Sequence, residues 1–322
     1  KSNDDNDSDD GDNNGSNDTD NTSDSSANSG TLILDATCAP QNIKYPQDIE
    51  LLNETREKLE EMICRLSDEN GFYRPRMYRE KARKDYLALA KCRKRSAKNI
   101  RKAIKKQLQY IRRDLGYIDN LIENNGVELR KSDAKLLDIL MTVYEQQQYM
   151  YENKTHTVND RIVSISQPYI RPIVRGKAKS PVEFGAKLDL SVDETGMCRL
   201  EKLSFNAYNE SEVLKSAIEN YKKRTGHYPE RVLVDQIYRN RENITFCNSL
   251  GIRLSGKKLK KKKKDVDTKL DKKTTYQDNT DRIEVERKFS FAKRKFGLGL
   301  LLTKREDTSK ASIVLSIIAM NI

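Results

Sequence analysis

The chain has 322 residues, of which 61 are basic and 49 acidic, and its formal net charge is +12. Residues 1–30 carry −8 and residues 31–322 therefore carry +20, a balance that indicates a polyanionic partner such as nucleic acid, with a ribosomal or membrane-surface partner as the alternative. Two histidines are too few for serine–histidine–aspartate catalysis or a histidine-rich zinc site, and the five scattered cysteines form no C-x-x-C pair. A metal used on phosphates would be held by carboxylates, which favours Mg²⁺ or Mn²⁺.

Residues 1–30 are rich in Asp, Asn, Ser and Gly and predict an acidic disordered linker. Because the first residue is Lys, we expect a further segment before it. Residues 31–37 then predict a buried strand in which three apolar residues lead into Asp35.

A helical region follows this strand. Asp48 can cap a helix that runs to about Leu66, and residues 79–123 predict one long helix. The long helix has a coiled-coil seam with alternating steps of three and four, formed by Ile100, Ile104, Leu108, Ile111, Leu115, Ile118 and Ile122. After a break at residues 124–126, a return helix over 132–151 completes a predicted antiparallel helical hairpin.

The stretch from Arg74 to Arg113 holds 17 basic and two acidic residues. A helix with this charge would bind a phosphate backbone without regard to sequence, with Arg93 and Lys94 among the contacts. The alternative is a solvated coiled-coil face, although such a face normally mixes charges of both signs.

Beyond residue 168 the pattern changes to strands with intervening helices. A hairpin is predicted over residues 183–192 and 197–205, and a short strand that ends in Asp235 is predicted over residues 231–235. Helices are predicted over residues 209–224, 240–250, 282–296 and 309–322. Residues 257–264 hold seven lysines in eight positions and are either a DNA-gripping arm, with Lys260 in it, or a disordered loop. No apolar run is long enough to span a membrane. This order of elements predicts an α/β protein with a ribonuclease-H-like core and a helical insertion after the first strand.

Two predicted strands end in an acid, Asp35 and Asp235, and such residues can meet if the strands are neighbours. Glu286 offers a third carboxylate on the helix over 282–296, with Lys293 two turns further along the same face. Three carboxylates can hold two divalent cations that activate a water or a 3′-hydroxyl. The alternatives are that each Asp caps a helix and that Glu286, like nearby Glu284, is an exposed helix residue.

Several blocks resemble DDE transposases of bacterial insertion sequences. These blocks are Leu34-Asp-Ala-Thr-Cys-Ala-Pro40 with Tyr45-Pro-Gln-Asp48, then Ser166-Gln-Pro168, Arg171-Pro-Ile-Val-Arg-Gly-Lys177 and Glu183-Phe-Gly-Ala-Lys187, then Val234-Asp-Gln-Ile-Tyr-Arg-Asn-Arg-Glu-Asn243, and finally Arg282-Ile-Glu-Val-Glu-Arg-Lys-Phe289 through Leu298. The resemblance covers about residues 31–322. It implies that Asp35, Asp235 and Glu286 bind the metals and that Lys293 is their basic companion. One departure is Arg287, where the resemblance implies a small residue.

By this resemblance we expect a Mg²⁺- or Mn²⁺-dependent transposase, with two ions, that cleaves transposon ends with water and then joins the freed 3′-hydroxyl to target DNA. The expected core comprises residues 31–46 and 156–322, and the basic helical insertion residues 47–155. The residues expected to contact DNA are Lys293, Arg282, Arg171, Arg175, Lys177, Lys187, Arg93, Lys94 and Lys260. We expect a homodimer or higher multimer on DNA in the bacterial cytoplasm, associated with the nucleoid when bound. The alternatives are a truncated or inactive DNA-binding relative and a host ribonuclease-H-like nuclease.

Overall fold

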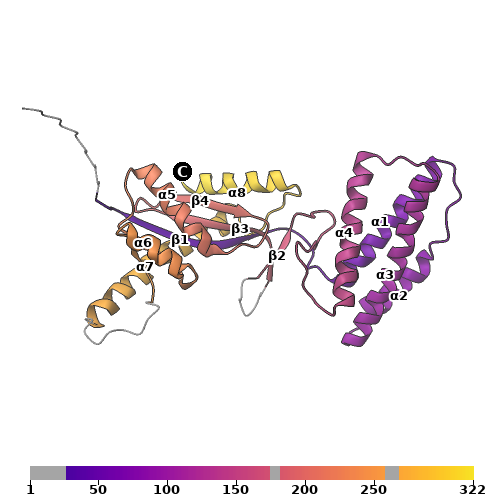
Figure 1. Cartoon of the computed structure of the whole chain (residues 1–322), viewed down its shortest axis with the longest axis horizontal. Coiled ribbons are helices and arrows are strands. Elements are labelled where there is room, and N and C mark those ends of the chain that lie inside the picture. Colours follow the sequence, from indigo (N-terminus) through magenta and orange to yellow (C-terminus); the bar gives the residue numbers. More distant parts are fainter. Residues whose placement is uncertain (1–26, 175–181, 258–267) are drawn as a thin grey trace, which may run out of the picture.

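The computed structural model describes residues 27–174, 182–257 and 268–322. It contains a mixed sheet with helices on both faces and a separate helical bundle, joined by the chain segments 41–47 and 153–170 (Figure 1). The bundle falls between the first and second strands in sequence. The protein is therefore a mixed α/β protein.

The sheet has six strands: β1 (Thr31–Pro40), β2 (Arg171–Val174), β3 (Val182–Val192), β4 (Cys198–Ser204), β5 (Arg231–Leu233) and β6 (Arg253–Leu254). The strand order is β2-β3-β1-β5-β6, and β4 also pairs with β3. Strand β3 is antiparallel to β1, β2 and β4, whereas β1, β5 and β6 are mutually parallel. The predicted hairpin is confirmed as β3 and β4, joined by a turn in which the Asp193 side chain accepts hydrogen bonds from the backbone N–H groups of Thr195 and Met197, both 3.1 Å.

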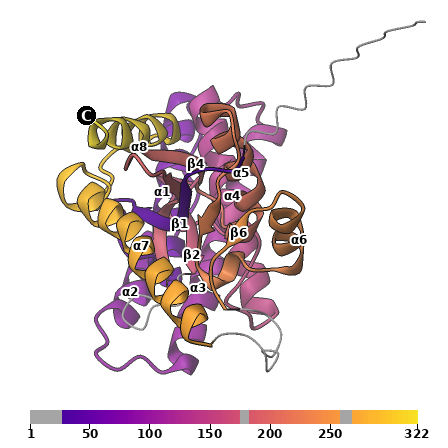
Figure 2. The ribbon, with the colours of Figure 1, turned by 90° about the vertical axis from the view of Figure 1, so that its left-hand side faces the viewer.

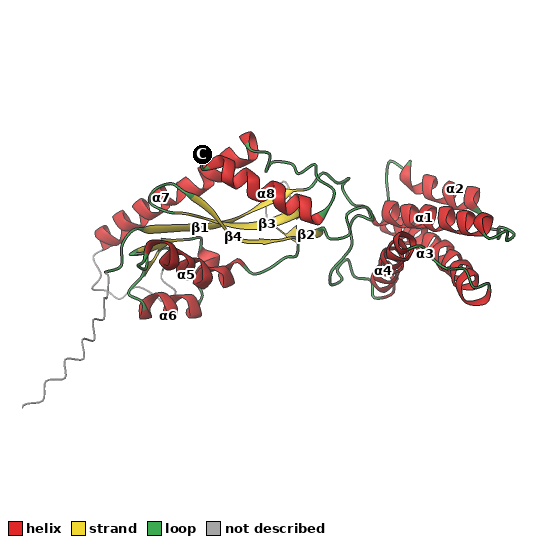
Figure 3. Ribbon diagram, turned by 90° about the horizontal axis from the view of Figure 1, so that it is seen from above, coloured by secondary structure: helices red, strands yellow, loops and turns green. Residues whose placement is uncertain are grey.

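Alternation along β1 places apolar side chains on both faces of the sheet. Leu32 and Leu34 pack with α5 (Val213–Thr225) and α6 (Arg241–Ser249), while Ile33 packs with α7 (Thr268–Lys295) and α8 (Glu306–Met320). Figure 3 shows the two helix pairs on opposite sides of the sheet, and Figure 2 shows α7 and α8 from the end of the molecule. Strand β1 is therefore buried on both faces.

The helical bundle contains α1 (Asp48–Glu69), α2 (Arg79–Ala90), α3 (Ala97–Asp119), a π-helical turn η1 (Asn120–Asn124) and α4 (Lys131–Glu152). Its core includes Leu59 and Ile63 of α1, Ile111 and Ile118 of α3, and Leu140 of α4. The α3–α4 pair matches the predicted hairpin, but α1 packs against both members of the pair, so three long helices share this core.

Three predicted boundaries are wrong. The long helix over 79–123 is interrupted at residues 91–96, and α3 begins after Ser96, whose Oγ accepts a hydrogen bond from the Asn99 N–H at 3.2 Å. The first strand continues to Pro40, so Asp35 lies in its middle instead of at its end. Helix α7 begins at Thr268, well before residue 282. Within the described residues, no helix has the length and apolar character that crossing a membrane requires.

Candidate functional site

Asp35 and Asp235 lie on neighbouring parallel segments of the chain. Strands β1 and β5 pair in register from Thr31 opposite Arg231 to Ile33 opposite Leu233. Strand β5 ends at Leu233, and Asp235 caps the 3-10 turn η3 (Gln236–Tyr238), where its carboxylate accepts a hydrogen bond of 2.6 Å from the Gln236 N–H. Asp35 and Asp235 each follow the last pair of this register by two residues.

The electrostatics of Asp35 indicate that these two acids interact. Burial raises the pKa of Asp35 to about 6. A hydrogen bond from the Ala36 N–H (2.8 Å) and the charge of Arg282 lower this pKa, while the charges of Asp235 and Glu210 raise it. Asp35 is thus a largely buried carboxylate that lacks a full counter-charge, a state that a cation would relieve.

Glu286 is linked to Asp35 through the side chain of Arg282. One guanidinium nitrogen of Arg282 lies 3.5 Å from Asp35 Oδ2, and the other lies 3.2 Å from Glu286 Oε1, one helical turn further along α7. Glu286 is half-exposed, whereas the Asp35 side chain is only 17% exposed. The single guanidinium therefore joins the strand acid to the helix acid.

The donors suit a hard divalent cation, because all are carboxylate oxygens and Asp35 is under-neutralised. Across the described ranges, however, no group of three or more His, Cys, Asp or Glu side chains is arranged to hold a metal ion. Arg282 explains this spacing, since its guanidinium lies between Asp35 and Glu286. The charge of Asp235 acts on Asp35, and Glu286 is linked to Asp35 through the Arg282 guanidinium.

The expected DNA contacts fall into different environments. Arg93 and Lys94 are exposed in the segment between α2 and α3, and Lys293 is half-buried in the last turn of α7. Arg171 is half-buried, donates to the Ile170 carbonyl at 3.1 Å and to the Pro168 carbonyl, and burial lowers its pKa. Three expected contacts lie outside the described residues: Arg175, Lys177 and Lys260.

Lys187, another expected DNA contact, takes part in an internal ion pair. It is 8% exposed, and its ammonium lies 2.8 Å from both a Glu210 carboxylate oxygen and the Tyr208 carbonyl. The internal ion pair leaves little of this side chain for a phosphate. Arg287 raises no packing conflict, because it is 73% exposed and pairs with Glu284 at 3.4 Å.

Sequence reasoning missed the buried acid Asp189 on β3. Its carboxylate is fully buried and accepts hydrogen bonds from the hydroxyls of Tyr238 (2.6 Å) and Tyr208. Burial raises its pKa and the two phenols lower it. The sequence signal that could have found Asp189 was an acid between the apolar residues Leu188 and Leu190 of a predicted strand. In the structure most other positions of this strand are buried.

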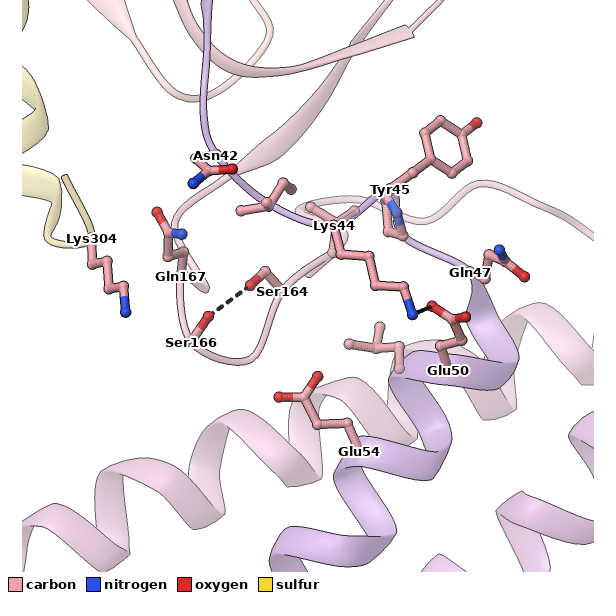
Figure 4. Close-up of a pocket in the computed structure, with 14 residues that line it drawn as sticks. Asn42, Lys44, Tyr45, Gln47, Glu50, Glu54, Ser164, Ser166, Gln167 and Lys304 are labelled. Carbon is pink, nitrogen blue, oxygen red and sulfur yellow. Dashed lines mark hydrogen bonds and ion pairs between the residues drawn. The ribbon is translucent and has the colours of Figure 1, made fainter. Parts of the chain in front are cut away.

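The pocket in Figure 4 lies elsewhere, where the segments 41–47 and 163–167 join the sheet to the bundle. It has a volume of about 240 Å³. Its Lys44 ammonium turns to Glu50 at 2.7 Å, and Ser164 and Ser166 bond to each other at 3.1 Å. These polar groups satisfy one another, so the carboxylate group on β1, η3 and α7 remains the stronger candidate site.

Residues 232–322 match the family model of the transposase DDE domain. The carboxy-terminal part of this chain is therefore similar to the transposase DDE domain. The matched segment contains Asp235, Glu286 and Lys293, while Asp35 precedes it. Neither a curated protein nor a solved structure matches the chain. The resemblance to DDE-type transposases is thus supported by the segment that carries the second and third acids.

Proposed function

We propose that this protein is a DNA transposase that cleaves DNA at transposon ends and transfers the 3′-hydroxyl to target DNA. The observation that carries the proposal is that Asp35 and Asp235 each follow, by two residues, the last pair of two adjacent parallel strands, and that the charge of Asp235 contributes to the raised pKa of Asp35. The transposase DDE domain match supports the same assignment. The substrate of such an enzyme is DNA, in keeping with the strongly basic chain.

In this proposal Asp35 and Asp235 hold divalent cations, and Glu286 completes the ligand set. Two Mg²⁺ or Mn²⁺ ions would activate the attacking water or 3′-hydroxyl and offset the charge on the leaving oxygen. Arg282 pairs with both Asp35 and Glu286 and partly offsets their charge, so the same guanidinium can bind a DNA phosphate when cations take over that role. Lys293 would contact the DNA two turns along α7.

By composition we call α2, α3 and the segment between them the basic side of the bundle and α1 and α4 its acidic side, and this uneven charge supports a DNA-binding role for α2 and α3. From Arg79 to Asp119 there are 15 basic and four acidic residues, whereas α1 has three basic and eight acidic residues and α4 two and four. Arg93 and Lys94 lie on the basic side. A solvated face of mixed charge would not segregate in this way. We propose that DNA lies along α2 and α3 with α1 and α4 turned away.

We further propose that the sheet and its four flanking helices form a ribonuclease-H-like core, with the bundle as an insertion in it. The arrangement that supports this is a central β1 bearing the first acid, covered by helix pairs on both faces. Assembly as a homodimer or higher multimer that bridges two transposon ends, and action at the nucleoid in the bacterial cytoplasm, belong to the same proposal.

The test is Mg²⁺- or Mn²⁺-dependent nicking of supercoiled plasmid by the full chain. Asp235→Asn and Glu286→Gln are each expected to reduce the rate more than about 100-fold. The matched control is Glu284→Gln, which removes a carboxylate two residues away that pairs with Arg287. Wild-type nicking by Asp235→Asn would overturn the proposal, and DNA binding without nicking by the wild type would identify a binding protein instead.

A further inference from the structure

The position of Asp235 depends on more than the sheet. Strand β5 ends at Leu233, so Asp235 has no ladder hydrogen bonds with β1. On one side the chain is held by the Val234 N–H, which donates to Ser255 Oγ at 2.9 Å. On the other side η3 closes with the Tyr238 N–H donating to the Asp235 carbonyl at 3.1 Å. Movement of Tyr238 would therefore move Asp235.

Tyr238 is anchored to the strand that pairs with β1. It is fully buried, and its hydroxyl donates to Asp189 Oδ1 at 2.6 Å. Asp189 lies on β3 directly opposite Ala36, the residue after Asp35. A short chain of contacts thus links the Asp235 turn, through Tyr238 and Asp189, to the backbone beside Asp35.

Asp189 does not share the space of the candidate metal ligands. In the β1–β3 register Asp35 faces Leu190 and Ala36 faces Asp189, so Asp35 and Asp189 project from opposite faces of the sheet. Asp35 pairs with Arg282 of α7, whereas Asp189 bonds to Tyr238, which packs on the face covered by α5 and α6. Asp189 can therefore support the candidate site from the opposite face of the sheet, but it cannot ligate an ion held by Asp35.

We propose that the Tyr238–Asp189 hydrogen bond is a positioning contact that holds the Asp235 turn level with Asp35, an inference that rests on the proposed function. Tyr238 and Asp189 touch neither DNA nor metal. They act through Asp235, in the way that groups behind metal ligands set ligand geometry. A buried carboxylate such as Asp189 keeps this geometry because moving away from Tyr238 would leave its Oδ1 oxygen without that donor.

The chain offers a matched control for this proposal. Tyr208→Phe removes the other phenol from the same Asp189 carboxylate, but Tyr208 belongs to a segment without candidate ligands. Both variants delete one hydroxyl and one hydrogen bond to the Asp189 carboxylate, the Tyr238 bond being buried and the Tyr208 bond partly buried. We expect Tyr238→Phe to weaken Mn²⁺ binding at least about 10-fold, measured by calorimetry on the full chain, and Tyr208→Phe less than about 3-fold.

Two further measurements separate positioning from stability. Hydrogen–deuterium exchange over residues 234–240 should be faster in Tyr238→Phe than in Tyr208→Phe, and DNA binding in EDTA should be unchanged in both. Equal Mn²⁺ affinities in the two variants, or faster exchange without a change in affinity, would overturn the positioning role. Failure of the proposed function would be recognised separately, because Asp235→Asn would then bind Mn²⁺ and nick DNA like the wild type. The positioning role, which rests on the proposed function, would also be rejected in that case.

Discussion

Asp35 and Asp235 each follow, by two residues, the last paired residues of two adjacent parallel strands, Ile33 and Leu233, although 200 positions separate the two acids in the chain. Burial and the neighbouring charge of Asp235 together raise the pKa of Asp35 to about 6. The folded protein therefore keeps a carboxylate whose charged form is disfavoured chiefly by burial, as functional sites often do.

Replacing the Asp35 carboxylate with a neutral group is expected to raise the free energy of unfolding while removing metal-dependent nicking. Asp35→Asn keeps the side-chain volume and eliminates a buried carboxylate, so the free energy of unfolding in EDTA at pH 8 should rise by about 1–3 kcal/mol. Metal-dependent nicking should fall more than about 100-fold. Denaturant unfolding and plasmid nicking measure the two effects. Glu284→Gln, on an exposed side chain, should change neither, and destabilisation by Asp35→Asn would contradict the electrostatic argument.

Arg282→Gln is expected to have an effect on stability that depends on divalent ions. The guanidinium contributes favourable charge to Asp35 at 3.5 Å and to Glu286 at 3.2 Å, and its loss should lower the free energy of unfolding in EDTA by about 1 kcal/mol. Saturating Mg²⁺ supplies the missing positive charge, so the difference from wild type should shrink. Thermal unfolding with and without Mg²⁺ measures this. An equal difference in both conditions would mean that cations do not bind beside Arg282.

Local sequence patterns predicted most of the elements that position the site. The alternation of Leu32, Ile33 and Leu34 correctly indicated a strand, and its two helix-covered faces follow from the same pattern. The return helix α4 and the β3–β4 hairpin are confirmed because their signals, amphipathic spacing and turn residues, are local. The break at residues 91–96 was missed because the basic residues there are compatible with a helix; the local signal that could have indicated it is Ser96, which caps α3.

The sequence is compatible with Asp35 and Asp235 lying on neighbouring segments of the chain, but no local pattern requires this arrangement. Strand neighbours far apart in the chain are chosen by the whole fold, and no local signal specifies that β5 lies beside β1. The buried role of Lys187 and the presence of Asp189 were not predictable for the same reason. Each depends on partners, Glu210 and Tyr238, that only the folded sheet brings near.

The basic side of the bundle predicts a specific salt dependence of DNA binding. Each phosphate contact releases counterions, so replacing Arg93 and Lys94 together with Gln should reduce the slope of log affinity against log salt by about 2. The matched control is Lys131→Gln with Lys135→Gln, which removes two exposed lysines from α4 on the acidic side. Fluorescence anisotropy over a range of salt concentrations measures both slopes. Equal changes would indicate that DNA does not prefer the α2–α3 side.

Asp114 in α3 should make the stability of the bundle depend on pH. The residue is fully buried, its nearest cation is Arg113 at 3.5 Å, and neither of its carboxylate oxygens has a hydrogen-bond partner among the described residues. Burial raises the pKa of Asp114 to about 7; Arg113 opposes this shift and the buried Glu60 adds to it. The native state therefore keeps a proton that the unfolded chain, with an ordinary pKa of 3.8, has already released.

The sign of the effect follows from proton linkage. Between pH 3.8 and about 7 the native state binds more protons at Asp114 than the unfolded state, so the free energy of unfolding falls as pH rises through this window and levels off above it. Asp114→Asn removes this contribution. We expect the variant to match wild type near pH 4 and to be more stable by about 1–3 kcal/mol at pH 8. Urea unfolding at several pH values tests this, and a constant difference across the window would show that Asp114 does not titrate there.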